Sequence, residues 1–346
     1  MLFQQILLTI LSSFHKERTI SAAYHLLKGK RSGQTIQDVG LFKLYPYFGL
    51  LPKLSRQKFE EQVDLLFAKN NIVLEEDGYY RLTDAGQEAA KAPLDFFFDG
   101  WHYRGNEHLF FARLSLIVQS LSHQQNAVKA FIPIERNEQV QQWVRQFLIR
   151  QNYGRQLLQQ PLYEEITNSL GQLPIDEHLK DIVVYRFTGF NQPGYTWQQL
   201  AFGYHMQEMD IQLLYISTLH QWLNEIYRTP ERYPILSALT QGVRVETLLT
   251  DSANTTAQLF KKGYSIEQIC QMRKLKTSTI EDHLVELAMN DSSFSIESFV
   301  TYAEQQQIFD AVETYETKKL RILHEILPHI SYFQLRLALA KGAMNS

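Results

Sequence analysis

The sequence predicts a mainly α-helical protein of several domains, and three observations lead to this expectation. The chain has 346 residues, more than one ordinary domain usually contains. Apolar residues recur with helical spacing along most of it, and prolines separate the periodic runs. One hairpin signal, Asp77-Gly78, stands between two short apolar runs. We therefore expect a winged-helix-like domain at 1–92, a helical middle domain at 93–240 and a helix-turn-helix domain at 241–346.

Composition excludes several classes of protein. There are 34 Lys and Arg against 37 Asp and Glu, a formal net charge of −3, which excludes a globally basic nucleic-acid coat protein. A hydrophobic content of 45% excludes wholesale disorder. The single cysteine, Cys270, excludes a disulfide framework and a Cys-rich zinc site. The apolar start lacks a basic region and is far shorter than the roughly 18 residues of a spanning helix. We expect a cytoplasmic protein without membrane contact.

The N-terminal segment is expected to contain three helices and then a hairpin. The first helix covers about 2–13, and the second covers 20–28 with Thr19 or Ser21 as its cap. A loop rich in glycine and proline follows, and its marker residues are Gly33, Gly40, Pro46, Gly49 and Pro52. Ser55 is expected to cap the third helix. This order is the sequence outline of a winged helix.

The expected wing has the sequence IVLEEDGYYRLTDAGQEAA, in which Thr83 is placed to cap a short final helix. This stretch resembles the wing of many bacterial winged-helix regulators. Its tip carries Glu75, Glu76 and Asp77 against Arg81 alone. Because acidic residues repel phosphate, protein docking or scaffolding is favoured over DNA binding for this domain.

The middle segment is expected to be mostly helical, and its function is left open. The helical runs are 107–122, 137–151, 154–169, 176–186, 196–206, 208–227 and 231–239. The aromatic stretch at 95–106 has two interpretations. Trp101, His102 and Tyr103 either stack on bases or a partner peptide, or they pack inside the protein. The packing interpretation is favoured.

No catalytic constellation is found in the sequence. The segment GKRSGQT at 29–35 lacks the Gly-Lys-Ser/Thr that phosphate cradling requires. The two histidines of HEILPH at 324–329 are five residues apart, and Pro328 ends that helix. We therefore expect a non-enzymatic protein with no cofactor, no metal and no small-molecule substrate.

The segment 254–290 has the pattern of a helix-turn-helix. Gly263 ends one helix, Ser265 caps a short second helix, and Thr277 is expected to cap a third. The apolar residues of this pattern form one expected core: Ile269, Leu275, Ile280 and Leu284. Cys270 supplies the small residue that is needed where two helices cross.

Charge within this segment indicates DNA contact. Residues 261–276 carry five basic residues and one acidic residue, a net charge of +4. Cations of this kind usually contact the phosphate backbone, and the first residues of the second helix of the motif reach base edges. The candidate DNA-binding residues are Lys261, Lys262, Arg273, Lys274, Lys276, Thr277, Ser278, Thr279 and His283. Glu281 and Asp282 oppose phosphate approach, so a helix-turn-helix used for protein contact is kept as an alternative.

The segment LFKKGYSIEQICQMRKLKTSTIEDHLVEL resembles the helix-turn-helix module at the C-terminus of RecQ-type DNA helicases. The residues that carry this resemblance are Gly263, Ser265, Arg273, Leu275, Thr279, Ile280, His283 and Leu284. The later segments FSIESFV and ISYFQLRLALAKG resemble the rest of that module, with Ser331 beginning a final helix. The chain has no helicase motor. As a whole it is similar to the YpbB family of Firmicutes, stand-alone proteins linked by gene neighbourhood to a RecQ helicase.

The resemblance implies a DNA-binding accessory that acts with a RecQ-type helicase in DNA repair or recombination. Residues 255–290 would contact DNA, and the first 240 residues would dock the motor or orient the module. Two alternatives stay open. One is a transcription regulator that reads an operator as a dimer. The other is a protein-interaction adaptor that does not bind DNA.

Overall fold

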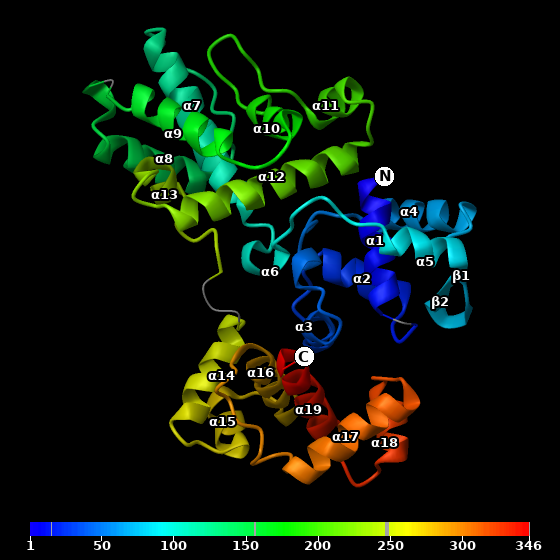
Figure 1. Ribbon diagram of the computed structural model, residues 1–346. Helices are drawn as coiled ribbons and strands as arrows, with labels where there is room; N and C mark the ends of the chain where they lie inside the picture. The colour runs from blue at the N-terminus through cyan, green and yellow to red at the C-terminus, as the bar shows by residue number, and fades with distance from the viewer. Residues whose placement is uncertain (15, 156, 246–248, 346) are drawn as a thin grey trace. The chain divides into compact units, whose positions relative to one another are not determined.

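The computed structural model describes residues 1–14, 16–155, 157–245 and 249–345, which are mainly helical with one two-stranded sheet (Figure 1). The chain forms two compact units. The middle unit consists of residues 1–6 and 93–245, and the terminal unit consists of residues 7–92 and 246–346. Helix α1 (Leu2–Ser13) contributes residues to both units. The three predicted domains are a different division of the chain and stay a prediction.

The middle unit is built around α12 (Glu208–Arg228), against which α7, α9, α10, α11 and α13 pack. Its helices are α6 (Gly100–Tyr103), α7 (Glu107–Gln125), α8 (Glu138–Arg150), α9 (Gln159–Gly171), α10 (Glu177–Val184), α11 (Trp197–Gly203), α12 and α13 (Pro234–Leu239), with a 3₁₀ turn at Tyr153–Arg155. Trp222 of α12 is fully buried, and its indole Nε1 donates to the Ser169 hydroxyl at 2.7 Å. The predicted helical character of this segment is confirmed, but α9 begins at Gln159 rather than at 154 and α13 begins at Pro234 rather than at 231.

Part of the aromatic stretch at 95–106 packs inside the middle unit, while Phe97 is exposed. Trp101 and Tyr103 are buried, and the Tyr103 ring stacks on His220 with centroids 4.7 Å apart. The Tyr103 hydroxyl donates to Oδ1 of Asn224 at 2.6 Å. The packing interpretation of this stretch is therefore confirmed for these two residues.

The N-terminal part of the terminal unit contains α2 to α5 and the hairpin. Its elements are α2 (Ile20–Leu27), α3 (Gly33–Leu41), α4 (Arg56–Ala68), β1 (Ile72–Leu74), β2 (Tyr80–Leu82) and α5 (Asp84–Lys91), with 3₁₀ turns at Tyr45–Tyr47 and Glu76–Gly78. The strands are antiparallel, with Ile72 opposite Leu82. Ser55 accepts from the Lys58 N–H and Thr83 accepts from the Gly86 N–H. The expected hairpin and these two caps are confirmed.

Helix α3 corrects the expectation of a glycine- and proline-rich loop after the second helix. Ser32 caps it by accepting from the Thr35 N–H, and residues 35–41 are all buried. Its two glycines face α16 (Thr277–Asn290) at close approach. A Cβ on Gly33 would lie 2.7 Å from Cγ of Asp282, and one on Gly40 would clash with the end of Met289. The glycines therefore mark a tight helix contact, which local sequence cannot distinguish from a loop.

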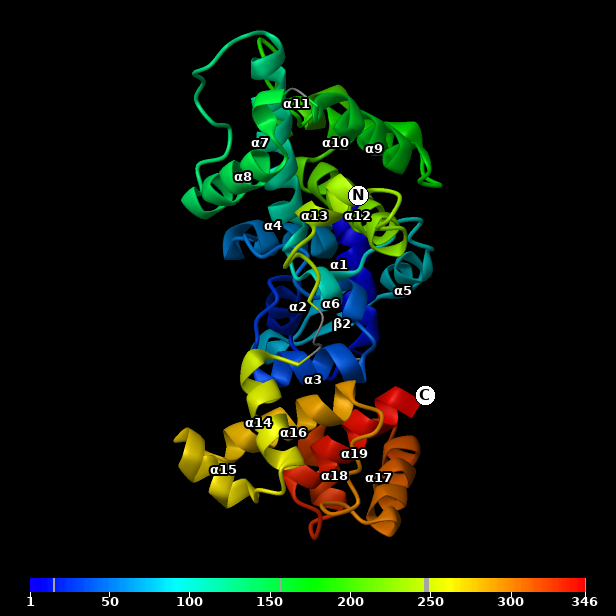
Figure 2. The same ribbon diagram turned by 90° about the vertical axis from the view of Figure 1, so that its left-hand side faces the viewer.

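The C-terminal part of the terminal unit is a helical domain around α16. Its helices are α14 (Asp251–Lys261), α15 (Ile266–Arg273), α16, α17 (Tyr302–Tyr315), α18 (Leu320–Ile326) and α19 (Tyr332–Asn345). Helices α14, α15, α19 and α3 all pack on α16. Figures 1 and 2 both show α3 beside α16 and α19, so the N-terminal and C-terminal segments of this unit share one core. Ser331 accepts from the Gln334 N–H at the start of α19, as expected.

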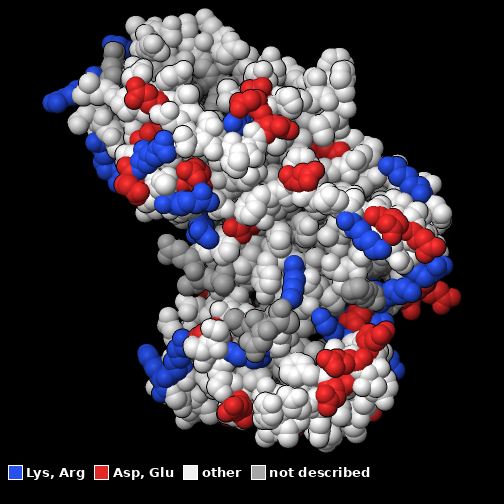
Figure 3. Space-filling model, viewed as in Figure 1, with Lys and Arg blue, Asp and Glu red and all other residues white. Residues whose placement is uncertain are grey.

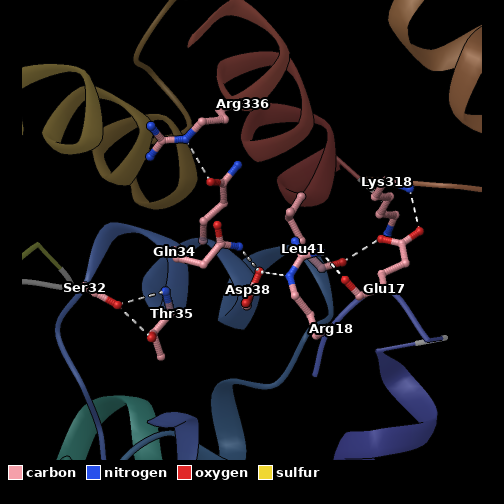
Figure 4. Close-up of polar contacts among 10 residues, drawn as sticks. Glu17, Arg18, Ser32, Gln34, Thr35, Asp38, Leu41, Lys318 and Arg336 are labelled. Atoms are coloured by element: carbon pink, nitrogen blue, oxygen red, sulfur yellow. Dashed lines mark hydrogen bonds and ion pairs between the residues drawn. The ribbon is translucent and has the colours of Figure 1, made fainter. Parts of the chain in front are cut away.

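Polar contacts surround α3 and join it to both segments (Figure 4). Arg18 Nε lies 2.8 Å from Oδ1 of Asp38, and the backbone N–H of Lys318 donates to Oε1 of Glu17. Burial raises the pKa of Asp38, and the neighbouring Arg18 opposes that rise. The Lys318 Nζ also donates to the carbonyl of Leu41 at 3.0 Å. Charged residues inside this contact are therefore paired rather than left in an apolar setting.

Candidate nucleic-acid interface

The helix-turn-helix is formed by α14, α15 and α16. Ser265 begins α15 with a capping box, in which its hydroxyl accepts from the Gln268 N–H and the Gln268 side chain accepts from the Ser265 N–H. Lys274 ends α15 in the left-handed conformation, with φ of 53°, and so turns the chain toward α16. Ile269, Ile280 and Leu284 are fully buried where the helices meet. The expected cap at Ser265 and this part of the core are confirmed, whereas Leu275 is only half-buried.

The cap of α16 corrects one expectation. Thr277 was expected to cap this helix, but Lys276 is the N-cap and no side chain caps the first turn. The carbonyl of Lys276 accepts from the N–H groups of Thr279 and Ile280, so the helix begins one residue earlier than the Thr277 pattern suggests. The Thr277 hydroxyl instead lies 3.9 Å from Sγ of the half-buried Cys270. The first N–H groups of α16 consequently have no side-chain cap and carry the positive end of the helix dipole.

Arg273 and His283 have partners inside the domain. Arg273 Nη1 donates to the carbonyl of Ser252 at 2.7 Å, and Nη2 donates to the Ser252 hydroxyl at 2.9 Å. The Thr256 hydroxyl contacts both Arg273 and Nδ1 of His283. His283 is buried, and burial lowers its pKa, with Arg273 lowering it further. These two candidates hold α14, α15 and α16 together, and a direct DNA contact by either stays a prediction.

The remaining basic candidates lie at the surface, two just before α15 and two just after it. In the part of the chain that the structure describes, Lys262, Lys274 and Lys276 are exposed and make no ion pair. Lys261 is exposed too, and its Nζ lies 3.4 Å from Oδ2 of Asp291. Figure 3 shows Lys and Arg gathered over α14 and α15 at the lower left. We call Lys261, Lys262, Lys274 and Lys276 the lysine edge.

The polar candidates of α16 continue this edge for one turn only. Thr277 and Ser278 are exposed and Thr279 is half-buried, whereas residues 283–289 are buried against neighbouring helices. Asp282 forms an ion pair with Arg336 of α19, next to Gly33 of α3. A cavity of about 390 Å³ separates parts of α3, α14 and α16, with His283 and Glu286 among its lining residues. Only the first turn of α16 is therefore free to approach a ligand.

Sequence reasoning did not select two apolar residues near the lysine edge. Tyr264 and Met272 are 38% and 54% exposed, and each lies within two residues of a lysine of the edge. Exposed aromatic and thioether groups beside cations suit contact with sugars and unstacked bases. The sequence did not distinguish Tyr264 and Met272 as binding residues, because their positions fit the ordinary pattern of an amphipathic helix.

The hairpin expected as a wing is present, and its tip is acidic as the sequence indicates. Glu75, Glu76 and Asp77 are exposed, and Arg81 lies 3.8 Å from Glu75. Within residues 1–14, 16–155, 157–245 and 249–345, no three His, Cys, Asp or Glu side chains gather in a way that suits a metal ion. Over those same residues, no helix is both long and apolar enough to cross a membrane.

These features define a mainly helical protein with a helix-turn-helix domain at its C-terminal end. A family model described as a helix-turn-helix domain matches residues 252–339, and it is of the type found at the C-terminus of RecQ-type helicases. Protein YpbB of Bacillus subtilis (strain 168) is 32% identical over 353 residues, which cover 98% of this chain and 97% of that protein. The chain belongs to the YpbB family. No solved structure matches it.

Proposed function

We propose that this protein is a non-enzymatic accessory that binds DNA through the lysine edge and acts with a RecQ-type helicase in DNA repair or recombination. The observation that carries the proposal is the lysine edge itself, with three lysines that have no ion-pair partner in the described residues. Exposed cations of this kind neutralise phosphates, and their contribution to the binding free energy is independent of DNA sequence. The helix-turn-helix domain matched at 252–339 supports the DNA contact.

The exposed part of α16 is its first turn. Thr277 and Ser278 are exposed, and residues 283–289 are not. The first residues of a recognition helix are those that reach base edges, so this exposure is compatible with base reading as well as with backbone contact. The uncapped first turn of α16 is also placed to contact phosphate, as helix N-termini do.

The protein-interaction adaptor is the second candidate, and the acidic wing favours it. The exposed Glu75, Glu76 and Asp77 repel a nucleic acid at the place where many winged helices contact it. In this alternative the helix-turn-helix serves protein contact, and the lysine edge binds an acidic surface of the helicase.

The test measures fluorescence anisotropy of labelled duplex, forked and single-stranded DNA between about 50 and 200 mM salt. Replacing Lys262, Lys274 and Lys276 by Ala should lower the affinity. The fall of log association constant with log salt concentration should become shallower by about two to three. A matched control replaces Lys53, Lys91 and Arg321, which are exposed elsewhere in the terminal unit, and should leave the slope unchanged.

Two outcomes separate the candidates. Absence of DNA binding by the unmodified protein at about 50 mM salt would overturn the DNA-binding proposal, since non-specific binding is strongest at low salt. Capture of a purified RecQ-type helicase without DNA binding would support the adaptor. The helicase partnership itself is contradicted if the two purified proteins do not associate in a pull-down.

A further inference from the structure

A groove in the middle unit lies between α7, α8 and the non-helical segment 127–136. Its volume is about 650 Å³. Its floor is aliphatic and is made by Leu116 of α7 and by Val144 and Leu148 of α8, all of which are buried. It lies outside the helix-turn-helix domain and none of the proposed DNA contacts line it.

The wall of the groove is held in place by two glutamine amides, one buried and one half-buried. Gln119 is 5% exposed, and its Nε2 donates to the carbonyl of Ile132 at 3.1 Å while its Oε1 accepts from the Ile134 N–H at 2.8 Å. One side chain thus pairs with the segment as a neighbouring strand would. Gln141 Nε2 donates to the carbonyl of Glu135 at 2.7 Å and fixes the end of the segment. The wall is therefore preorganised, which lowers the entropic cost of binding.

Alternate residues of the wall turn to the groove. Lys129, Phe131 and Pro133 line it, while Ile132 between them is 90% exposed. On the opposite side Ile149 of α8 lines the groove and is 69% exposed. Large aliphatic side chains exposed around an apolar floor are characteristic of surfaces that bind another protein.

The rim of the groove is basic in an otherwise acidic segment. Residues 127–155 contain five Lys and Arg against two Asp and Glu, whereas residues 93–240 as a whole contain 11 against 14. Lys129 and Arg145 line the groove, are exposed, and form no ion pair within the described residues. Glu138 is an acidic residue of the lining. The excess of unpaired cations selects a negatively charged ligand.

We propose that this groove binds a short acidic segment of a partner protein that carries aliphatic or aromatic side chains between its carboxylates. The apolar side chains of that segment bury on Leu116, Val144 and Leu148. Its carboxylates pair with Lys129 and Arg145 at the rim. A nucleic acid fits less well, because the floor is aliphatic. Of the lining residues only Phe131 and Tyr153 have aromatic rings on which bases could stack. The assignment does not depend on DNA binding by the lysine edge.

The experiment uses the full-length protein and a fluorescein-labelled peptide of sequence Glu-Asp-Leu-Glu-Asp-Phe-Leu-Glu-Asp. Fluorescence anisotropy should show saturable binding that weakens about tenfold when Lys129→Glu and Arg145→Glu are combined. Ile149→Asp should weaken it to a similar degree, because the charge enters the apolar part of the groove. All three positions are exposed, so the variants should keep the circular dichroism spectrum of the parent. The matched control Lys53→Glu, in the terminal unit, should change the affinity by less than about twofold.

Two further probes separate the apolar from the charge contribution. A peptide with Leu and Phe replaced by Ser should bind at least about tenfold more weakly, because it lacks apolar anchors. Equal binding of this peptide would overturn the proposal, as would no binding of the first peptide up to about 1 mM. A single-stranded DNA oligonucleotide that competes with the peptide, and whose own binding falls in the Ile149→Asp variant, would also overturn it and identify the groove as a nucleic-acid surface.

Discussion

The Arg273 guanidinium lies 3.4 Å from Nδ1 of His283, and both side chains contact the Thr256 hydroxyl at the centre of the helix-turn-helix. Three helices meet through these three side chains. Burial and the adjacent guanidinium both disfavour a protonated imidazole, so the pKa of His283 lies below its ordinary value of 6.5. Charge on His283 would therefore oppose the packing of α14, α15 and α16.

The first prediction concerns acid sensitivity. Because the pKa of His283 is lower in the folded state, the unfolded chain binds the proton first as pH falls below 6.5. His283 should therefore cost no stability above that pH, and stability should decrease as pH falls from 6.5 to the lower folded value. The urea midpoint of His283→Gln should depend less on pH in this window than that of the parent. Parallel pH profiles for the two proteins would contradict the prediction.

The second prediction separates a structural from a surface cation. Arg273→Ala removes the hydrogen bonds to Ser252 and Thr256 and should lower the free energy of unfolding by roughly 2 kcal/mol. Lys276→Ala removes an exposed side chain that caps nothing, and stability should change by less than about 0.5 kcal/mol. Urea denaturation gives both values. A Lys276→Ala protein as destabilised as Arg273→Ala would contradict this division.

The third prediction concerns Gly86, in the first turn of α5. A Cβ at this position would lie 2.8 Å from the carbonyl carbon of Asn71 and would also clash with the attached oxygen. The backbone of Asn71 cannot move aside as a flexible side chain can. Gly86→Ala should therefore destabilise the protein by at least about 1 kcal/mol, although Ala has the better helix propensity. Gly203→Ala is the matched control, because a Cβ there meets nothing within 4 Å. The control should be neutral or stabilising by up to about 1 kcal/mol, and equal effects of the two changes would refute the argument.

Local sequence predicted the elements whose signals are themselves local. Ser55, Thr83 and Ser265 each cap a helix through an N–H three residues later, so the pattern and the structure involve the same few residues. The hairpin was also predictable, because the two apolar runs flank Asp77-Gly78. The helix-turn-helix followed for the same reason, since its turn and its core lie within about forty consecutive residues.

The expected cap of α16 was wrong by one residue, whereas the larger omissions depended on distant residues. Helix α3 was missed because Gly33 and Gly40 contact Asp282 and Met289, some 250 residues away, and nothing near them records that contact. The internal partner of Arg273 was equally hidden, since a basic residue that donates to a carbonyl of another helix has the same local pattern as one that faces solvent. Composition and spacing thus located the lysine edge, but they did not reveal which cations the fold itself uses.

The fourth prediction concerns the contact between α3 and α19. Arg336 Nε donates to Oε1 of the buried Gln37 at 2.9 Å, and Nη2 pairs with Asp282 of α16. Since the Asp282 side chain is 38% exposed, solvent screens that pair and the hydrogen bond to Gln37 contributes more. Arg336→Ala should therefore lower the free energy of unfolding by about 1–2 kcal/mol.

A double-mutant cycle isolates the contact between Arg336 and Gln37. Gln37→Ala combined with Arg336→Ala should cost less than the two single changes added, with a coupling energy of about 1 kcal/mol. The two residues are 299 positions apart in the chain, so this coupling can arise only if the N-terminal and C-terminal segments of the terminal unit pack together. Arg321→Ala is the control, because its partner Glu325 lies one turn away on α18. Additive costs at Arg336 and Gln37 would contradict a stabilising contact between these two side chains.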